Sequence, residues 1–158
     1  MDILFIDACP RAQSRTRRLA EKVIACMNGE VTMLKLSEAR LPDINEEAAA
    51  KRAADSRSSD FTDSVYDYAK QFASADAIVI AAPFWDLSFP AILKKYIEAI
   101  TVSGITFKYS EEGIPVGKCR AGKLFYVTTA GGPIFNDEFG YGYIKTLAQG
   151  MYGISGCQ

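Results

Sequence analysis

Short apolar runs that alternate with segments of helical spacing constrain the fold of this chain more than any other feature. Strands are expected at residues 3–6, 31–36, 77–82 and 123–129, with the beginning of a fifth at residues 151–154. The runs at residues 3–6 and 77–82 are continuously apolar, which is typical of strands buried on both faces of a parallel sheet. Because strands and helices alternate along the chain, we expect an α/β fold with a doubly wound parallel sheet.

The segments between these runs predict helices and one hairpin. Apolar residues recur at helical spacing in residues 14–27, 65–72, 90–100 and 143–149, whereas residues 40–60 give only a weak helix signal. Residues 106–109 alternate in polarity and then meet Glu111-Glu112-Gly113, which predicts a small hairpin. The sequence has no repeat and no linker, so we expect one domain over residues 1–158.

Length and charge narrow the classes of partner. The 158 residues are enough to bury a real core, and the net charge of -1 gives no reason to expect a nucleic-acid or anionic-membrane partner. No stretch approaches the roughly 18 apolar residues that a membrane span needs. Asp2 and Asp7 bracket the first apolar run, so no signal peptide is expected. These features predict a cytoplasmic protein without a nucleic-acid or membrane partner.

The content of histidine and cysteine excludes several kinds of catalysis. The chain has no histidine, which excludes the Ser-His-Asp and Cys-His nucleophile systems and the usual zinc hydrolases. Its four cysteines form no Cys-x-x-Cys pair, so neither a disulfide framework nor a metal site is expected. Catalysis is therefore expected to come from a cofactor, or from a cysteine assisted by arginine.

Three of the expected strands end in loops of unusual composition. We call them the anion loop (residues 9–16), the aromatic loop (residues 83–87) and the glycine loop (residues 129–132). In an open α/β sheet the ligand crevice lies outside the carboxyl ends of the strands. The three loops are therefore expected to form one site, and a ligand with a phosphate at one end and a flat ring system at the other would use all of them.

The anion loop leads into a helix whose start is rich in arginine. The residues are Arg11, Arg15, Arg17 and Arg18. Cations are unfavourable beside the positive end of a helix dipole, and a phosphate held by backbone N–H groups, Ser14, Arg15 and Thr16 would explain them. Alternatively, Ser14 is only an N-cap and the arginines are solvated. No Gly-x-Gly-x-x-Gly motif or Walker loop follows the first strand, which favours a monophosphate.

The aromatic loop places Phe84, Trp85 and Leu87 at the end of the most apolar strand. Large side chains at such a point can simply cap the core. The neighbouring Thr129-Ala130-Gly131-Gly132 favours a ligand instead, because glycines let the backbone approach a flat molecule closely and offer it N–H donors.

Three segments carry a family resemblance: PFWDL at residues 83–87, FPAILK at residues 89–94 and GITF at residues 104–107. In these segments, and in its anion and glycine loops, the chain resembles the flavodoxin-like FMN-dependent NADH azoreductase and NAD(P)H quinone reductase family. The resemblance extends from residue 1 to about residue 155. It implies a flavodoxin-like, three-layer α/β/α fold with five parallel strands in the order 2-1-3-4-5.

The resemblance also implies a cofactor and its site. Ser14, Arg15 and Thr16 would bind the FMN phosphate, Pro83, Phe84, Trp85, Asp86 and Leu87 would flank the ring system, and Thr129, Ala130, Gly131 and Gly132 would contact its pyrimidine edge. NADH or NADPH would reduce the flavin and a quinone or azo compound would then reoxidise it, in a ping-pong cycle that needs no catalytic side chain. Members of this family are homodimers, and Phe107, Tyr109, Phe135, Phe139 and Tyr141 are the candidates for the subunit boundary.

The end of the chain departs from the family pattern. The family continues past its fifth strand into a final helix, whereas this sequence stops at Gly156-Cys157-Gln158. It therefore resembles a C-terminally truncated member with an incomplete final strand and helix. We expect residues 151–154 to be an uncovered apolar edge strand, which would favour pairing with another chain.

Other functions fit parts of the pattern. Cys9 and Arg15 have the nucleophile and phosphate-clamp spacing of low-molecular-weight cysteine phosphatases, although Pro10 removes one N–H from the loop. A flavodoxin-type electron carrier would use the same fold, but such carriers are usually far more acidic than this chain. A receiver-type module would need an aspartate after the third strand, where Ala81-Ala82-Pro83 stands.

Overall fold

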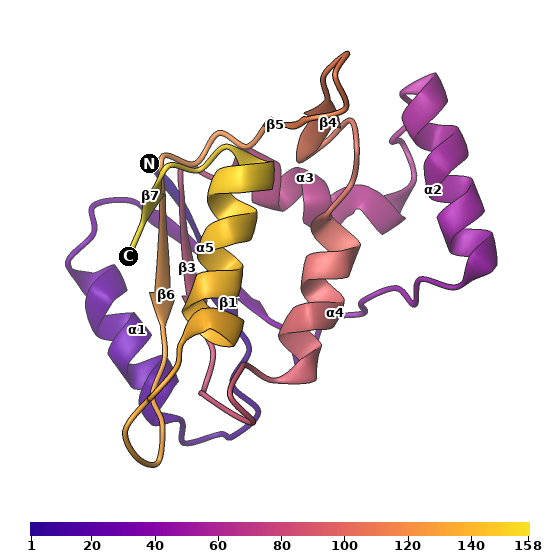
Figure 1. Cartoon of the computed structure of the whole chain (residues 1–158). Helices are drawn as coiled ribbons and strands as arrows, with labels where there is room; N and C mark the ends of the chain where they lie inside the picture. Colours follow the sequence, from indigo (N-terminus) through magenta and orange to yellow (C-terminus); the bar gives the residue numbers. More distant parts are fainter.

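Five parallel strands form the centre of the computed structural model, which describes all of residues 1–158 (Figure 1). From one edge to the other they are β2 (Glu30–Lys35), β1 (Asp2–Asp7), β3 (Ala77–Ala81), β6 (Lys123–Val127) and β7 (Gly156–Cys157). The predicted parallel sheet is confirmed. The order β2-β1-β3-β6-β7 differs from the expected 2-1-3-4-5 because β4 (Phe107–Tyr109) and β5 (Pro115–Gly117) form the predicted antiparallel hairpin, outside this sheet.

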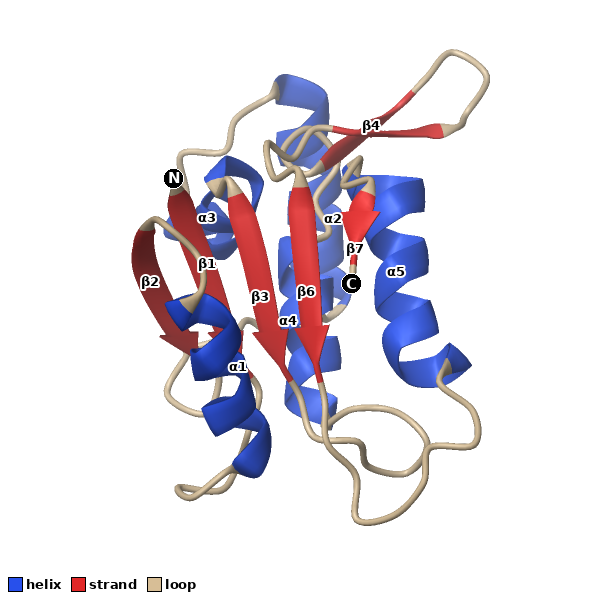
Figure 2. Ribbon diagram, turned by 90° about the vertical axis from the view of Figure 1, so that its left-hand side faces the viewer, coloured by secondary structure: helices blue, strands red, loops and turns tan.

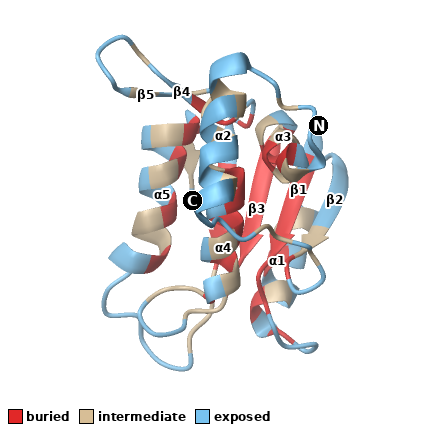
Figure 3. Ribbon diagram, turned by 90° about the vertical axis from the view of Figure 1, so that its right-hand side faces the viewer, coloured by how far each residue is buried: buried red, intermediate tan, exposed pale blue.

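Helices cover the two faces of the sheet unequally, as Figure 2 shows. On one face α1 (Arg15–Ala25) packs on Ile3 and Phe5, and on the other α3 (Asp67–Ser74), α4 (Ala91–Ile100) and α5 (Tyr143–Leu147) pack on Leu4 and Ile6. Successive strand residues point to opposite faces, so the continuous apolar run of β1 supplies both cores. At the β2 edge the face that carries α1 is open, because Val31 and Met33 are 42% and 47% exposed. Figure 3 shows most of β2 in the colour of exposed residues.

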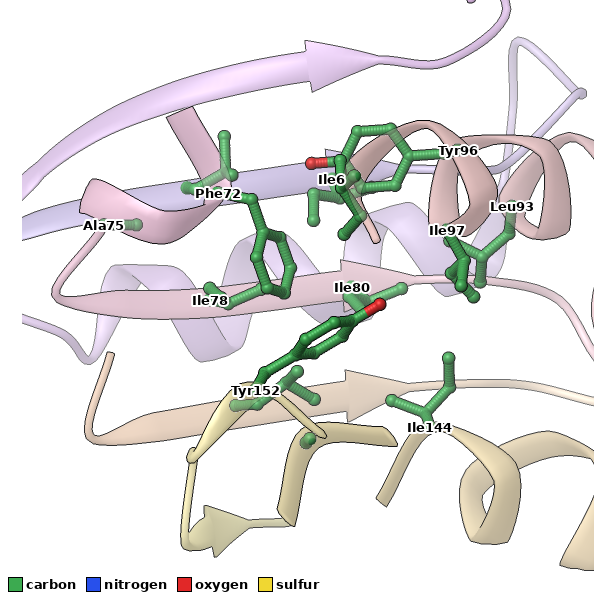
Figure 4. Packing of buried hydrophobic residues seen from close by; sticks show 14 of the residues in the cluster. Ile6, Phe72, Ala75, Ile78, Ile80, Leu93, Tyr96, Ile97, Ile144 and Tyr152 are labelled. Carbon is green, nitrogen blue, oxygen red and sulfur yellow. The ribbon is translucent and has the colours of Figure 1, made fainter. Parts of the chain in front are cut away.

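The larger core lies between the sheet and the three helices. In Figure 4 Phe72 of α3 and Tyr152 point toward each other over Ile78 and Ile80 of β3. Their ring centroids are 5.1 Å apart in an edge-to-face arrangement. Phe72 also lies 6.5 Å from the ring of Tyr96 in α4. These contacts fasten the helical layer to the sheet and so fix where the loops after β3 and β6 emerge.

The expectation of a strand at residues 151–154 is wrong. Two π-helical turns, η2 (Glu138–Gly142) and η3 (Ala148–Tyr152), flank α5 and continue it in both directions. Ile144, Ala148 and Tyr152 are all buried and recur every four residues, which is the apolar stripe of a helix. Gly153 ends the helix with a φ of 79°, and the edge strand follows at β7.

The weak helix signal of residues 40–60 corresponds to α2 (Glu46–Ser58), which has no buried residue. Asn45 caps its start, and polar contacts join it to the last turn of α4 and to the segment that follows α4. Arg52 donates to the Glu98 carbonyl at 2.8 Å and Ser56 donates to the Ser103 carbonyl at 2.9 Å. A short 3-10 turn, η1 (Ser64–Tyr66), leads on into α3. None of the helices is both long and apolar enough to cross a membrane.

The packing of Phe72 predicts a large loss of stability on truncation. Phe72 is 1% exposed, so Phe72→Ala should lower the free energy of unfolding by about 3–5 kcal/mol. Leu19 of α1 is 44% exposed and serves as the control. Leu19→Ala should change the free energy of unfolding by less than about 0.5 kcal/mol. Urea denaturation measures both. A cost below about 1 kcal/mol for Phe72→Ala would show that the helix through Tyr152 does not close over Phe72.

Candidate functional site

The loops that follow β1, β3 and β6 emerge together at one end of the sheet (Figure 2). They enclose an open cleft of about 270 Å³. Its lining consists of Pro10, Arg11, Gln13, Ser14, Arg15, Thr16, Pro83, Phe84, Trp85, Thr129, Ala130 and Gly131. All three loops contribute, and nine of the twelve residues predicted to bind a cofactor lie on this cleft. The three loops lie together around one cleft, as expected. The role of each residue in binding stays a prediction.

Cations and hydroxyls, without acids, line one end of the cleft. Arg11 and Arg15 are exposed, and the twelve lining residues include no aspartate or glutamate. Ser14 caps α1, because its hydroxyl oxygen accepts from the Arg17 N–H at 3.2 Å, and it keeps its own proton to donate. The N-terminus of an 11-residue helix therefore lies on a cleft that two arginines also line. Such an end attracts an anion, and a phosphate most of all.

Arg17 has a different role from the one that its position suggests. Its Nε lies 2.5 Å from Asp7, whose side chain is fully buried, and its other nitrogens donate to the carbonyls of Ala12 at 2.8 Å and Cys9 at 3.1 Å. Arg17 needs no anionic ligand, because Asp7 neutralises it, so the expectation drawn from all four arginines is wrong for this residue. A charged residue at the end of a buried strand needs a partner of opposite charge. The position of Asp7 in the sequence was therefore the one sign that an ion pair forms here.

Hydrogen bonds tie the anion loop to the glycine loop. The hydroxyls of Thr16 and Thr129 are 2.7 Å apart, and the Arg15 guanidinium donates to the Ala130 carbonyl at 3.4 Å. Thr16 is only 1% exposed, so this contact lies at the floor of the cleft. Whichever hydroxyl donates in the threonine pair, the other keeps a proton for a ligand. The two ends of the site are thus held in a fixed relation.

The other end of the cleft is aromatic and open. Trp85 is 40% exposed and Phe84 is half-buried beside it. A Cβ added at Gly131 would meet nothing within 4 Å, so the backbone of the glycine loop is free on that side. The backbone N–H of Phe84 donates to the Thr129 carbonyl at 3.0 Å, which keeps the aromatic and glycine loops adjacent. A flat ring system would find an apolar surface and backbone N–H groups together here.

Asp86, Leu87 and Gly132 do not line the cleft, although they were predicted with the site. Asp86 and Leu87 form the tip of a tight turn with φ of 50° and 65°, a left-handed conformation that costs about 1–3 kcal/mol for each such residue. Trp85 and Ser88 close this turn by exchanging backbone hydrogen bonds of 3.1 and 2.8 Å. Strain of this kind concentrates at ligand loops, and no glycine or asparagine in the sequence signals it.

The surroundings of Cys9 do not suit a nucleophile. The side chain is 2% exposed, is absent from the cleft lining, and donates to the Ala81 carbonyl at 3.6 Å. Burial raises the pKa of the Cys9 thiol to about 11. A thiolate nucleophile needs a lowered pKa and access to its substrate. These observations argue against the phosphatase alternative.

Comparisons with known proteins agree with this architecture. The family described as a flavodoxin-like fold matches residues 1–158. The FMN-dependent NADH:quinone oxidoreductase 2 of Clostridium acetobutylicum is 40% identical, in an alignment that covers 97% of this chain and 81% of that relative. The FMN-dependent NADH:quinone oxidoreductase of Caldicellulosiruptor bescii is 37% identical, over 96% and 81% of the two chains. This chain therefore spans about four fifths of the length of these relatives.

A solved structure is similar over the same extent. The crystal structure of an azoreductase from Bacillus anthracis superposes with a TM-score of 0.83 and is 27% identical. The match covers 99% of this chain and 84% of that one. The likeness thus includes the sheet and all three loops of the cleft.

The burial of Cys9 predicts its resistance to alkylation. Because burial raises the pKa of the Cys9 thiol to about 11, this thiol is protonated at pH 8, and its side chain is also out of reach of solvent. Iodoacetamide at pH 8 should therefore modify the exposed Cys26 at least about a hundredfold faster than Cys9 in the folded protein. Mass spectrometry of the peptides measures both rates, and the urea-unfolded protein is the control. Equal rates in the folded protein would contradict the burial of Cys9.

Proposed function

This chain belongs to the family with the flavodoxin-like fold, and from that membership we propose that it is an FMN-dependent oxidoreductase. It would transfer reducing equivalents from NADH or NADPH to quinones or azo compounds. The observation that carries the proposal is a single cleft with cationic groups at one end and an aromatic surface beside free backbone at the other. Two relatives named as FMN-dependent NADH:quinone oxidoreductases and a similar azoreductase structure support the same reaction class.

The donor groups of the cleft fit FMN at both ends. A phosphate suits the start of α1 with Arg11 and Arg15, because the lining there is positive and holds no acid. A flat, mostly apolar ring suits Trp85 and Phe84. The hydrogen bond between Thr16 and Thr129 fixes the distance between the two ends of the cleft. A fixed distance suits a ligand that binds at both ends at once.

Each loop has a proposed task. Ser14, Arg15 and Thr16 bind the phosphate, and residues 83–87 flank the ring system. Backbone N–H groups of residues 129–132 face its pyrimidine edge, where they favour the negative charge that reduction brings. FMN itself, when bound, supplies the hydride and electron chemistry, so no side chain has to act as an acid or a base. The donor and the acceptor would use the same open face in turn, as a ping-pong cycle requires.

We also propose a homodimer. Of the five aromatic residues expected at a subunit boundary, Tyr109, Phe135 and Phe139 are 58%, 92% and 57% exposed. Tyr141 is half-buried, and its hydroxyl donates to the Cys157 carbonyl at 3.0 Å. Phe107 was expected among them, but it is 5% exposed and packs at 5.3 Å against the ring of Tyr109, so it cannot contribute. A cytoplasmic location, where reduced nicotinamides are available, is part of the same proposal.

Turnover is the direct test of this function. Without oxygen, protein loaded with FMN should oxidise NADH or NADPH continuously only when a quinone or an azo dye is present, followed at the absorbance of the reduced nicotinamide. Without an acceptor, oxidation should stop at one nicotinamide per bound flavin. A flavodoxin-type carrier would bind FMN but would not oxidise the nicotinamide. Failure of the folded, FMN-saturated protein to consume either nicotinamide with any quinone would refute the proposal.

Arg15→Ala should weaken FMN binding if the guanidinium holds the phosphate. Loss of one charge-assisted hydrogen bond predicts a cost of about 1.5–3 kcal/mol in binding free energy, which fluorescence titration measures. Arg18→Ala is the matched control, because Arg18 is exposed on α1 and does not line the cleft. An unchanged dissociation constant for Arg15→Ala would remove Arg15 from the phosphate site.

A further inference from the structure

One long exposed segment follows the glycine loop, and only its first residue, Gly131, lines the cleft. Residues 131–139, which we call the rim segment, run from the glycine loop into η2, and every one of them is exposed. The rim segment carries Phe135 and Phe139, which are 92% and 57% exposed. Burial therefore does not hold this segment in place, and its position depends on a few specific contacts.

A single hydrogen bond joins the rim segment to another part of the fold. The Ser88 hydroxyl donates to the Phe139 carbonyl at 2.6 Å, across 51 positions of sequence. The remaining hydrogen bonds of the segment are local: Asn136 with Glu138, and the amides of Gly140 and Gly142 with the Asp137 carbonyl. Ser88 is thus the one polar anchor between the rim segment and the aromatic loop.

The anchor itself is rigid at both ends. Ser88 exchanges two backbone hydrogen bonds with Trp85, which close the turn around Asp86 and Leu87. The buried Gly140, next to Phe139, lies against Phe84, because a Cβ added there would sit 3.8 Å from the Phe84 ring. The Ser88 hydroxyl therefore joins the closed turn at Trp85 to the backbone next to Gly140. Ser88 itself does not line the cleft.

We infer that Ser88 is a positioning residue for the aromatic end of the site. Its hydroxyl holds the Phe139 end of the rim segment against the turn that carries Trp85. In the terms of the proposed function, on which this role in binding rests, Ser88 keeps Trp85 in position for a flat donor or acceptor that enters at this end of the cleft. The residue touches neither substrate nor cofactor.

The first test uses the protein without any ligand. The amides of Gly140 and Gly142 both donate to the Asp137 carbonyl, which lies in the rim segment. Without the Ser88 hydroxyl this carbonyl should be less ordered. In Ser88→Ala the two amides should therefore exchange with deuterium about fivefold faster than in the wild type. Ser88→Thr keeps the hydroxyl and should restore slow exchange. Ser56→Ala is the matched control, because it removes a similar serine-to-carbonyl bond beside α2, and it should leave both amides unchanged. Equal exchange rates of these amides in Ser88→Ala and in the wild type would show that Ser88 does not anchor the rim segment.

The second test asks whether the anchor matters for the site. Ser88→Ala should raise the KM for a quinone about threefold or more while kcat stays near the wild-type value, and Ser88→Thr should reverse the change. Faster exchange with an unchanged KM and an unchanged dissociation constant for FMN would overturn the positioning role. If the wild type itself fails to bind FMN, the proposed function fails, and the exchange experiment still decides whether Ser88 anchors the rim segment.

Discussion

The buried ion pair between Asp7 and Arg17 is the interaction on which the cleft depends. Asp7 ends β1 between β2 and β3, and its carboxylate accepts from Arg17 at 2.5 Å and from the Cys9 N–H at 2.9 Å. Arg17 in turn satisfies two carbonyls of the anion loop. Removing one partner would leave a buried charge without compensation, at a cost of about 3–5 kcal/mol. The pair therefore fixes the path of the loop and leaves Arg11 and Arg15 free to face a ligand.

Contacts between the loops extend this order across the end of the sheet. Thr16 bonds Thr129, and Phe84 bonds the carbonyl of the same Thr129, so one residue of the glycine loop joins the other two loops. Ser88 adds the anchor to Phe139 on the open side. The cleft is consequently a property of three loops together. This arrangement suits a long cofactor better than a small anion.

The sequence predicted most of the fold because the buried strands are marked by local signals. The runs at residues 3–6 and 77–82 lie within β1 and at β3, and the loops after them meet at one end of the sheet because parallel strands share a direction. The same local reasoning was wrong at residues 151–154. There the apolar character of Met151 and Ile154 suggested a strand, whereas the spacing of Ile144, Ala148 and Tyr152 continues the helix.

Features that depend on distant contacts could not be predicted from local patterns. Arg17 was grouped with the other arginines because its partner, Asp7, is placed beside it only when α1 folds back on the sheet. Asp86 and Leu87 adopt positive φ without a glycine, because the bonds between Trp85 and Ser88 impose the turn. The bonds of Thr16 and Ser88 reach across 113 and 51 positions. Local patterns therefore placed nine of the twelve candidate residues on the cleft, and they did not predict the contacts that hold these residues.

If one cleft holds a phosphate at the start of α1 and a flavin ring beside Trp85, the protein must distinguish FMN from riboflavin, which is the same molecule without the phosphate. Titration of the protein with each compound measures this difference. FMN should bind at least about tenfold more tightly at low salt, and this advantage should shrink as salt screens the guanidinium groups. Equal affinities for the two compounds, or no binding of FMN by the folded protein, would contradict this arrangement.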